Sequence, residues 1–188
     1  MRILLIDNND SFTYNILELL RTNGFSKTDV LNSKSIQLEE ISEYDKIIIS
    51  PGPGLPSSFP ILYNIIDKYK AEKSILGICL GHQAICSYFK AELVKMPVVC
   101  HGQAHKMDVL KNTKLYLGLP DTFYVGLYHS WAVGETGFPS DLEITGISDT
   151  QTIMSVMHNK YDLHGIQFHP ESFISEYGAE ILKNFLIN

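Results

Sequence analysis

The chain has 188 residues, of which 45% are hydrophobic and 19% are charged, and its formal net charge is −6. This length and composition fit one globular domain with a sizeable core, and they exclude disordered and fibrous proteins. An acidic chain without a basic stripe is also a poor partner for nucleic acid or for an anionic membrane surface.

The amino terminus and the cysteines indicate the cellular compartment of the protein. The first apolar run, 3–6, ends at Asp7. It is too short for a secretion signal, which needs about 7–15 apolar residues, or for a membrane span, which needs about 20. The three cysteines are an odd number, which argues against a disulfide framework. We therefore expect a soluble protein of the cytoplasm.

In the first half of the chain, short apolar runs alternate with helical patterns. Strands that are buried on both faces appear as unbroken apolar runs, and strands that alternate with helices form parallel βαβ units. This order predicts a doubly wound, mostly parallel α/β sheet flanked by helices, with functional loops at the carboxyl ends of its strands. The expected strands are 2–6, 30–31, 46–49 and 74–78, and the expected helices are 12–20, 61–69 and 81–89.

The second half of the chain has mainly strand patterns joined by short turns. Asn159 and Lys160 have the character of a hairpin tip, and an apolar helical face predicts a final helix over 175–186. No Pro/Gly/Ser-rich linker interrupts the chain, so we expect residues 1–188 to form one domain. The expected strands are 107–110, 123–128, 142–147, 153–158 and 163–168.

The segment Gly77-Ile78-Cys79-Leu80-Gly81-His82-Gln83 has the glycine spacing of a nucleophile elbow, with Cys79 in the place of the usual serine. In that turn Cys79 lies at a helix N-terminus, which stabilises a thiolate. The Leu80 N–H is then placed to donate to an oxyanion. A free cysteine is more often a buried structural residue, and we expect this of the two other cysteines, Cys86 and Cys100.

A thiolate nucleophile needs a base, and the segment 165–172 offers one after an apolar strand. His169 and Glu171 are two residues apart, so in extended chain they project to the same side, and Pro170 keeps His169 out of the helical region. Glu171 can then hold one imidazole nitrogen while the other faces Cys79. A lone histidine is more often structural, but beside an elbow cysteine His169 is a candidate base.

A third motif, Ser50-Pro51-Gly52-Pro53-Gly54-Leu55-Pro56, directly follows the expected strand 46–49. Its glycines allow the backbone to approach a ligand closely, and its prolines stiffen the loop. Alone it is best interpreted as a tight loop. Its place at the carboxyl end of a strand of the same sheet as Cys79 favours a functional role.

Together with 7–15 and 128–131, these three motifs resemble the class I (triad-type) glutamine amidotransferases, in the order of that family and from Asp7 to Phe185. The chain looks most like the small subunits of anthranilate synthase and of aminodeoxychorismate (para-aminobenzoate) synthase. The resemblance implies a flavodoxin-like α/β fold with additional antiparallel strands in the carboxy-terminal half.

The resemblance also implies a reaction and a partner. Cys79 would attack the side-chain amide of glutamine, His169 would transfer protons with Glu171 beside it, and the Gly52 and Leu80 N–H groups would form the oxyanion hole. We expect no cofactor and no metal site in this chain. The ammonia would pass to a larger synthase subunit that binds chorismate. The residues that match the glutamine-binding residues of the family are Gly52, Pro53, Gly54, Gln83, Ser130 and Trp131.

The sequence departs from the family at the rim of the expected glutamine pocket. Leu127 stands where the family commonly has arginine, and Trp131 where it commonly has leucine. The segment 103–105 stands where the family usually has a basic residue with a nearby serine or threonine. None of these departures falls on the expected Cys-His-Glu triad.

Three other functions remain open from the sequence. The chain could be a free-standing cysteine γ-glutamyl hydrolase, or the amidotransferase of another synthase, such as GMP synthase. A metal-binding regulatory module would use Cys100, His101 and His105, although their spacing matches no standard zinc pattern. Both small subunits that the chain resembles share the same motifs, so the choice between anthranilate and aminodeoxychorismate also remains open.

Overall fold

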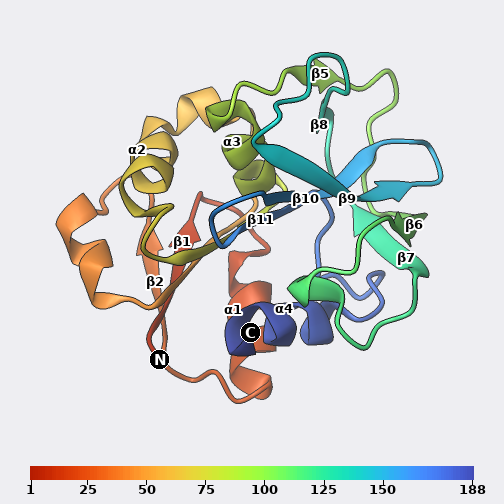
Figure 1. The fold of residues 1–188 in the computed structure, drawn as a ribbon. Coiled ribbons are helices and arrows are strands. Elements are labelled where there is room, and N and C mark those ends of the chain that lie inside the picture. The colour runs from red at the N-terminus through yellow and green to blue at the C-terminus, as the bar shows by residue number, and fades with distance from the viewer.

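The structure is a computed structural model that describes residues 1–188, and its central element is a nine-stranded sheet in the order β2-β1-β3-β4-β11-β10-β9-β6-β7 (Figure 1). A separate sheet of two strands pairs β5 (Leu93–Lys95) with β8 (Trp131–Val133). The strands of the large sheet are β1 (Ile3–Asp7), β2 (Thr28–Asn32), β3 (Lys46–Ile49), β4 (Ser74–Ile78), β6 (Gln103–Val109), β7 (Thr122–Leu127), β9 (Leu142–Ser148), β10 (Ile153–His158) and β11 (Leu163–Ile166).

The large sheet has a parallel half and an antiparallel half. β2, β1, β3, β4 and β11 are joined by four parallel pairings. β11, β10, β9, β6 and β7 are joined by four antiparallel pairings. The predicted α/β architecture, with parallel strands first and antiparallel strands in the carboxy-terminal half, is confirmed. The strand β11 is shared by the two halves.

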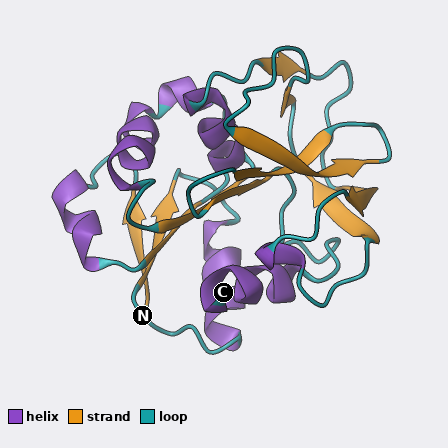
Figure 2. Ribbon diagram, viewed as in Figure 1, coloured by secondary structure: helices purple, strands orange, loops and turns teal.

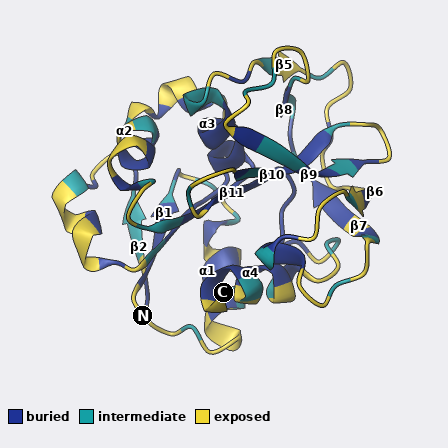
Figure 3. Ribbon diagram, in the orientation of Figure 1, coloured by how far each residue is buried: buried dark blue, intermediate teal, exposed yellow.

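Helices cover both faces of the sheet (Figure 2). α1 (Thr13–Thr22) and α4 (Gly178–Ile187) lie against each other on one face. α2 (Pro60–Tyr69) and α3 (Leu80–Tyr88) lie against each other on the opposite face (Figure 1). The outer sides of these helices are exposed, whereas the strands between them are buried (Figure 3).

Each face of the sheet has its own apolar core, and the strands of the parallel half supply both. Along β1, Ile3 and Leu5 join the cluster beneath α1 and α4, while Leu4 and Ile6 join the cluster beneath α2 and α3. Side chains alternate between the faces of a strand, so a strand covered on both sides must be apolar throughout. This is the physical reason for the unbroken apolar runs in the sequence.

The differences from the sequence prediction are mostly at the ends of elements. The short strands β5 and β8 were not predicted, nor were the 3-10 segments Leu38–Glu43, Pro56–Ser58 and Lys114–Tyr116. The final helix begins at Gly178 and not at Ser175, because Tyr177 has a left-handed backbone conformation with φ 56° and ψ 18°. No helix has the length and apolar content needed to cross a membrane.

Candidate active site

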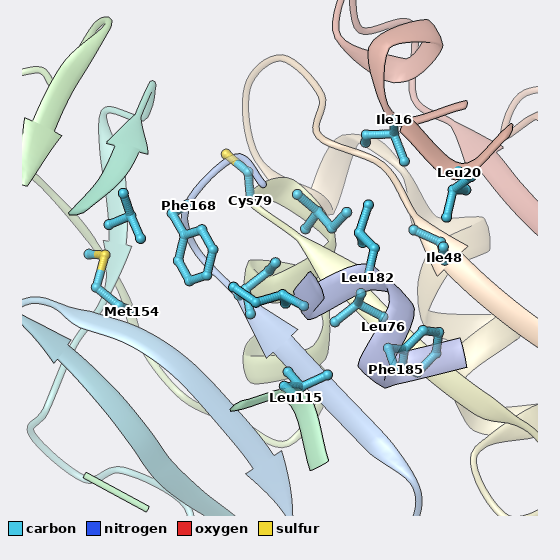
Figure 4. Close-up of a cluster of buried hydrophobic side chains, with 14 of the residues drawn as sticks. Ile16, Leu20, Ile48, Leu76, Cys79, Leu115, Met154, Phe168, Leu182 and Phe185 are labelled. Atoms are coloured by element: carbon cyan, nitrogen blue, oxygen red, sulfur yellow. The ribbon is translucent and has the colours of Figure 1, made fainter. Parts of the chain in front are cut away.

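Cys79 occupies the turn between β4 and α3, with a backbone conformation that L residues rarely adopt, φ 51° and ψ −99°. The flanking glycines are needed there, because a Cβ atom at Gly77 would collide with the carbonyl group of Gly81. The Cys79 side chain is 6% exposed and joins the larger apolar cluster, at its edge and beside Phe168 (Figure 4). The cysteine therefore lies in the strand–turn–helix setting of a nucleophile elbow.

The neighbouring strand β11 brings the histidine segment to this turn. β4 and β11 run parallel with Ile78 opposite Ile166. The Cys79 N–H donates to the carbonyl oxygen of Ile166 over 2.8 Å. Parallel strands end at the same edge of a sheet, so the residues that follow β11 start beside Cys79. The first of them, Gln167, donates from Nε2 to the Cys79 sulfur over 3.5 Å.

The imidazole of His169 is positioned by one hydrogen bond and by two aromatic rings. Its Nδ1 donates to Oε1 of Glu171 over 2.7 Å, and the Glu171 side chain is fully buried. The rings of Phe12 and Tyr128 pack edge-on against the imidazole, with centroid distances of 5.2 and 4.9 Å. The His169 backbone N–H donates to the carbonyl oxygen of Gly126 over 3.1 Å. Because Nδ1 is engaged by Glu171, Nε2 is the ring nitrogen left for a substrate.

The charge of His169 depends on its two partners. Burial lowers the pKa of His169, but the charge of the Cys79 thiolate and the hydrogen bond to Glu171 outweigh it and raise this pKa to about 10. Nε2 is buried and makes no close hydrogen bond, although the Cys79 sulfur is near enough for its charge to act on the ring. The arrangement favours the imidazolium form of His169.

The loop after β3 brings a backbone amide to the same turn. Asn8 fixes the start of this loop, because its Nδ2 donates to the carbonyl oxygen of Ser50 over 2.9 Å. A Cβ atom at Gly52 would lie 2.5 Å from Cδ2 of Leu80 and 2.8 Å from Cβ of Asn8, so only glycine fits there. The Gly52 N–H makes no hydrogen bond within the protein. Leu80 is the first residue of α3, and its N–H has no intrahelical acceptor.

A cavity of about 250 Å³ lies beside Cys79. All six residues that the sequence matched to glutamine binding line it, together with the nucleophile candidate. The structure therefore brings these residues together from separate segments of the chain. The cavity is lined by Gly52, Pro53, Gly54, Cys79, Gln83, Val99, Cys100, His101, Tyr128, His129, Ser130 and Trp131.

A second cavity, of about 220 Å³, lies on the His169 side of Cys79. It shares Cys79 and Tyr128 with the first cavity and extends to the loop that follows β1. The two cavities therefore adjoin each other at Cys79. The second is lined by Asp10, Ser11, Phe12, Pro51, Gly52, Pro53, Cys79, His101, Tyr128 and His169.

Sequence reasoning did not single out several residues that line these cavities. Phe12 and Tyr128 lie within motifs that the resemblance used, but no spacing rule points to their packing on a histidine. Val99 and His101 come from a segment without regular structure. The sequence had marked His101 only as a candidate ligand of a metal module, and Val99 had no signal there.

Burial favours the uncharged forms of Cys86, His82 and His129. Cys86 is fully buried, burial raises the pKa of its thiol, and its sulfur lies 3.9 Å from both ring nitrogens of His82. Burial lowers the pKa of His82 to about 3 and that of His129 to about 4. The Nδ1 atom of His129 donates to the carbonyl oxygen of Trp131 over 2.9 Å. His169 differs from His82 and His129 in that its surroundings favour the cation.

The residues of the alternative metal module do not converge. The ring of His105 is engaged by Asp149 at 2.9 Å and by Gln103 at 3.3 Å. His101 packs on Tyr128 with a centroid distance of 5.9 Å, and Cys100 lines the cavity beside Cys79. No three His, Cys, Asp or Glu side chains are grouped as metal ligands would be. The geometry gives no support to a metal module.

The chain is similar to known proteins over nearly its whole length. The family model described as glutamine amidotransferase class-I matches residues 4–188. The chain is 41% identical to anthranilate synthase component 2 of Azospirillum brasilense, over 98% of this chain and 94% of that protein. It is 38% identical to aminodeoxychorismate synthase component 2 of Escherichia coli, over 98% of both chains.

A solved structure extends this likeness to the fold. The structure of a candidate GMP synthase subunit from Thermoplasma acidophilum superposes with a TM-score of 0.89 at 26% identity, covering 99% of this chain and 92% of that one. The sequence resemblance to the class I glutamine amidotransferases is therefore confirmed at the level of both family and fold.

Proposed function

This chain belongs to the class-I glutamine amidotransferase family, and from that premise we propose that it is the glutamine-hydrolysing component of a chorismate-using synthase. Residues 1–188 would form one amidotransferase domain that hydrolyses glutamine to glutamate and delivers the ammonia to a larger subunit. The names of the relatives from Azospirillum brasilense and Escherichia coli support the chorismate-using partner. The three cysteines are all free thiols, which supports the cytoplasm as its compartment.

One observation carries the proposal: β4 and β11 end side by side, and the turn after β4 holds Cys79 while the segment after β11 holds His169. Nucleophilic catalysis by cysteine needs a thiolate, a proton-transferring imidazole and a group that orients the imidazole. The 2.7 Å hydrogen bond from His169 to Glu171 supplies the orientation. We assign the triad to Cys79, His169 and Glu171.

In the first half-reaction, the Cys79 thiolate attacks the side-chain carbonyl carbon of glutamine, and a C–S bond forms. The carbonyl electron pair moves to the oxygen, which the N–H groups of Gly52 and Leu80 would bind as an oxyanion hole. The pair then returns, the C–N bond breaks, and the leaving nitrogen takes a proton from His169. Ammonia and a γ-glutamyl thioester result.

The second half-reaction reverses the role of His169. Formation of the thioester removes the negative charge of the sulfur, which makes the largest contribution that raises the His169 pKa. Glu171 is then the only partner left to oppose the effect of burial, which lowers this pKa. The imidazole can therefore be neutral and can take a proton from an attacking water. The C–S bond breaks with its electron pair returning to sulfur, and glutamate leaves.

The two cavities suit two different tasks. The cavity of about 250 Å³ would hold glutamine, with Gln83, Ser130 and Trp131 among its binding residues. The cavity on the other side of the sulfur is lined by His169, which gives the proton to the leaving nitrogen. We assign the departure of ammonia toward the larger subunit to this second cavity.

The test is the replacement of Cys79 by alanine in the complex with its synthase subunit. Glutamine-dependent synthesis of the chorismate-derived product should be lost, whereas synthesis supplied with ammonium salt should persist. Full activity with glutamine would overturn the assignment of the nucleophile. A pull-down with the native chain as bait should identify the larger partner and show whether anthranilate or aminodeoxychorismate is the product.

Two alternatives are separated by the same experiments. The structural likeness to the candidate GMP synthase subunit favours a nucleotide synthase as the second candidate partner, and recovery of that synthase in the pull-down would establish it. Full glutaminase turnover by the isolated chain, unchanged when the synthase subunit is added, would identify a free-standing hydrolase.

A further inference from the structure

Gln167 is a buried polar residue with a contact that the reaction described above does not use. Its side chain is completely buried. Its Nε2 donates to the Cys79 sulfur over 3.5 Å, and its Oε1 lies 3.1 Å from Nε2 of Gln83. Burial of an amide side chain is costly unless its hydrogen bonds are made, so these two contacts together account for its place in the core.

The backbone carbonyl of Trp131 determines the orientation of the side-chain amides of Gln83 and Gln167. Nε2 of Gln83 donates to the carbonyl oxygen of Trp131 over 2.8 Å, and a carbonyl oxygen can only accept. Gln83 therefore presents its second N–H to Oε1 of Gln167. With its oxygen engaged there, Gln167 must turn its own N–H toward the sulfur of Cys79. The series of hydrogen bonds admits one orientation of both amides.

The Cys79 sulfur needs such a donor at two stages of the reaction. Cys79 is 6% exposed as a residue and belongs to an apolar cluster, so water offers little stabilisation to a charged sulfur there. An N–H donor aimed at sulfur favours the thiolate before attack on the substrate. The same donor favours the thiolate again when the C–S bond of the thioester breaks and the electron pair returns to sulfur.

We propose that Gln167 is a further catalytic residue, which donates a hydrogen bond to the Cys79 thiolate and is held in its working orientation by Gln83 and the Trp131 carbonyl. This proposal rests on the proposed function, because it takes Cys79 as the nucleophile. His169 supplies the opposite charge and moves the proton, whereas Gln167 is a neutral donor that gives up no proton.

The test compares the pH dependence of Cys79 alkylation by iodoacetamide in the wild-type chain and in Gln167→Met, which keeps the length of the side chain and removes its donor. A hydrogen bond to a charged group corresponds to roughly one pKa unit or more. We therefore expect the pH midpoint of alkylation to rise by about one unit. In the reconstituted complex, kcat for glutamine should fall about tenfold, with KM changed less than twofold.

Peptide mass spectrometry separates Cys79 from the other two cysteines and also reports on folding. Cys86 is completely buried and stays unlabelled while the variant is folded. Gln37→Met is the matched control, because it makes the same substitution at an exposed residue on the surface, and its alkylation midpoint should equal that of the wild type. An unchanged midpoint in folded Gln167→Met would overturn the proposal.

A second variant keeps the test decisive if Gln167→Met does not fold. Gln83→Met removes the partner that orients Gln167 without removing the donor itself, so the midpoint should rise by a smaller amount. Iodoacetamide has no glutamine moiety, so loss of substrate contacts at Gln83 does not affect this measurement. An unchanged midpoint here would overturn the orienting role, and wild-type protein without glutaminase activity would instead overturn the proposed function.

Discussion

The parallel and antiparallel halves of the sheet contribute to the site in different ways. In the parallel half, the site residues directly follow strands: the loop 50–56 follows β3, and Cys79 follows β4. Beside the antiparallel half, the cavity wall comes from the segment 99–101, which precedes β6, from 128–130, which follows β7, and from Trp131 of β8. The strand β11 pairs parallel with β4 and antiparallel with β10, so the segment with His169, which follows β11, starts beside the turn with Cys79, which follows β4. The parallel half therefore holds the proposed nucleophile and the proposed oxyanion donors, and the segment after β11 holds the residue proposed to transfer protons.

The largest expected effect comes from removing the group that transfers protons. His169→Asn keeps a side chain that can hydrogen-bond to Glu171 but cannot exchange protons with the substrate. Loss of a triad base costs on the order of a thousandfold or more in turnover. We expect that fall in glutamine-dependent kcat of the reconstituted complex, with ammonia-dependent synthesis retained. His105→Asn is the matched control, since His105 contacts Asp149 away from both cavities. A comparable fall in the control would show that the loss does not depend on acid–base chemistry.

The difference between buried parallel strands and segments held by tertiary contacts also explains which features the sequence predicted. The bounds of β3, β4 and β10 agree with those predicted, because buried strands between turns have clear apolar runs. The three predicted motifs also lie together, since strands of one parallel sheet end at a common edge. β5 and β8 could not be predicted, because each has three residues and forms only by pairing with a partner distant in the sequence. The contacts of Phe12 and Tyr128 with His169 likewise depend on tertiary packing.

The next expected effect is on the free energy of unfolding at acid pH, where His82 and His129 act in the opposite direction to His169. The folded-state pKa values of His82 and His129, about 3 and about 4, lie below that of a free imidazole. The unfolded chain therefore binds more protons below about pH 6.5, and stability falls as pH falls. The raised pKa of His169 has the opposite sign, since its contribution is present below about pH 6.5 and is lost toward pH 10.

We therefore expect the free energy of unfolding in urea to drop by on the order of 3 kcal/mol between pH 7 and pH 5. His82→Asn should remove about half of that dependence, because asparagine does not titrate in this range. Chemical denaturation at the two pH values measures both quantities. Equal stability of the wild-type protein at pH 7 and pH 5 would show that these histidines are not held neutral by burial.

A smaller effect tests the backbone donor that the parallel half supplies. In Gly52→Ala the new Cβ meets Cδ2 of Leu80 and Cβ of Asn8, so the loop must shift away from Cys79. Loss of one oxyanion donor costs about 100-fold in kcat, and we expect a fall of that order in glutamine turnover, with less change in KM. Gly118→Ala is the control: its φ of 76° makes alanine strained there, with nothing crowding the Cβ. It should lose stability without losing turnover, and equal losses of turnover would mean that Gly52 acts through folding alone.

The smallest expected effect distinguishes the contribution of the Trp131 side chain from that of its backbone carbonyl. Trp131 belongs to β8, where it pairs with Lys95 of β5, so the strand can hold its carbonyl in place whichever side chain it carries. Trp131→Leu, which introduces the residue common in the family, should change the wall of the cavity proposed to bind glutamine and raise KM a few-fold by the loss of apolar contact. The carbonyl would still accept from Gln83 and from His129. The pH midpoint of Cys79 alkylation should therefore stay at the wild-type value, whereas Gln83→Met moves it. If Trp131→Leu moved the midpoint as far as Gln83→Met does, the indole ring and not the carbonyl would orient the two amides. The two-stranded sheet would then act on Cys79 through the side chain of Trp131 and not through its strand pairing.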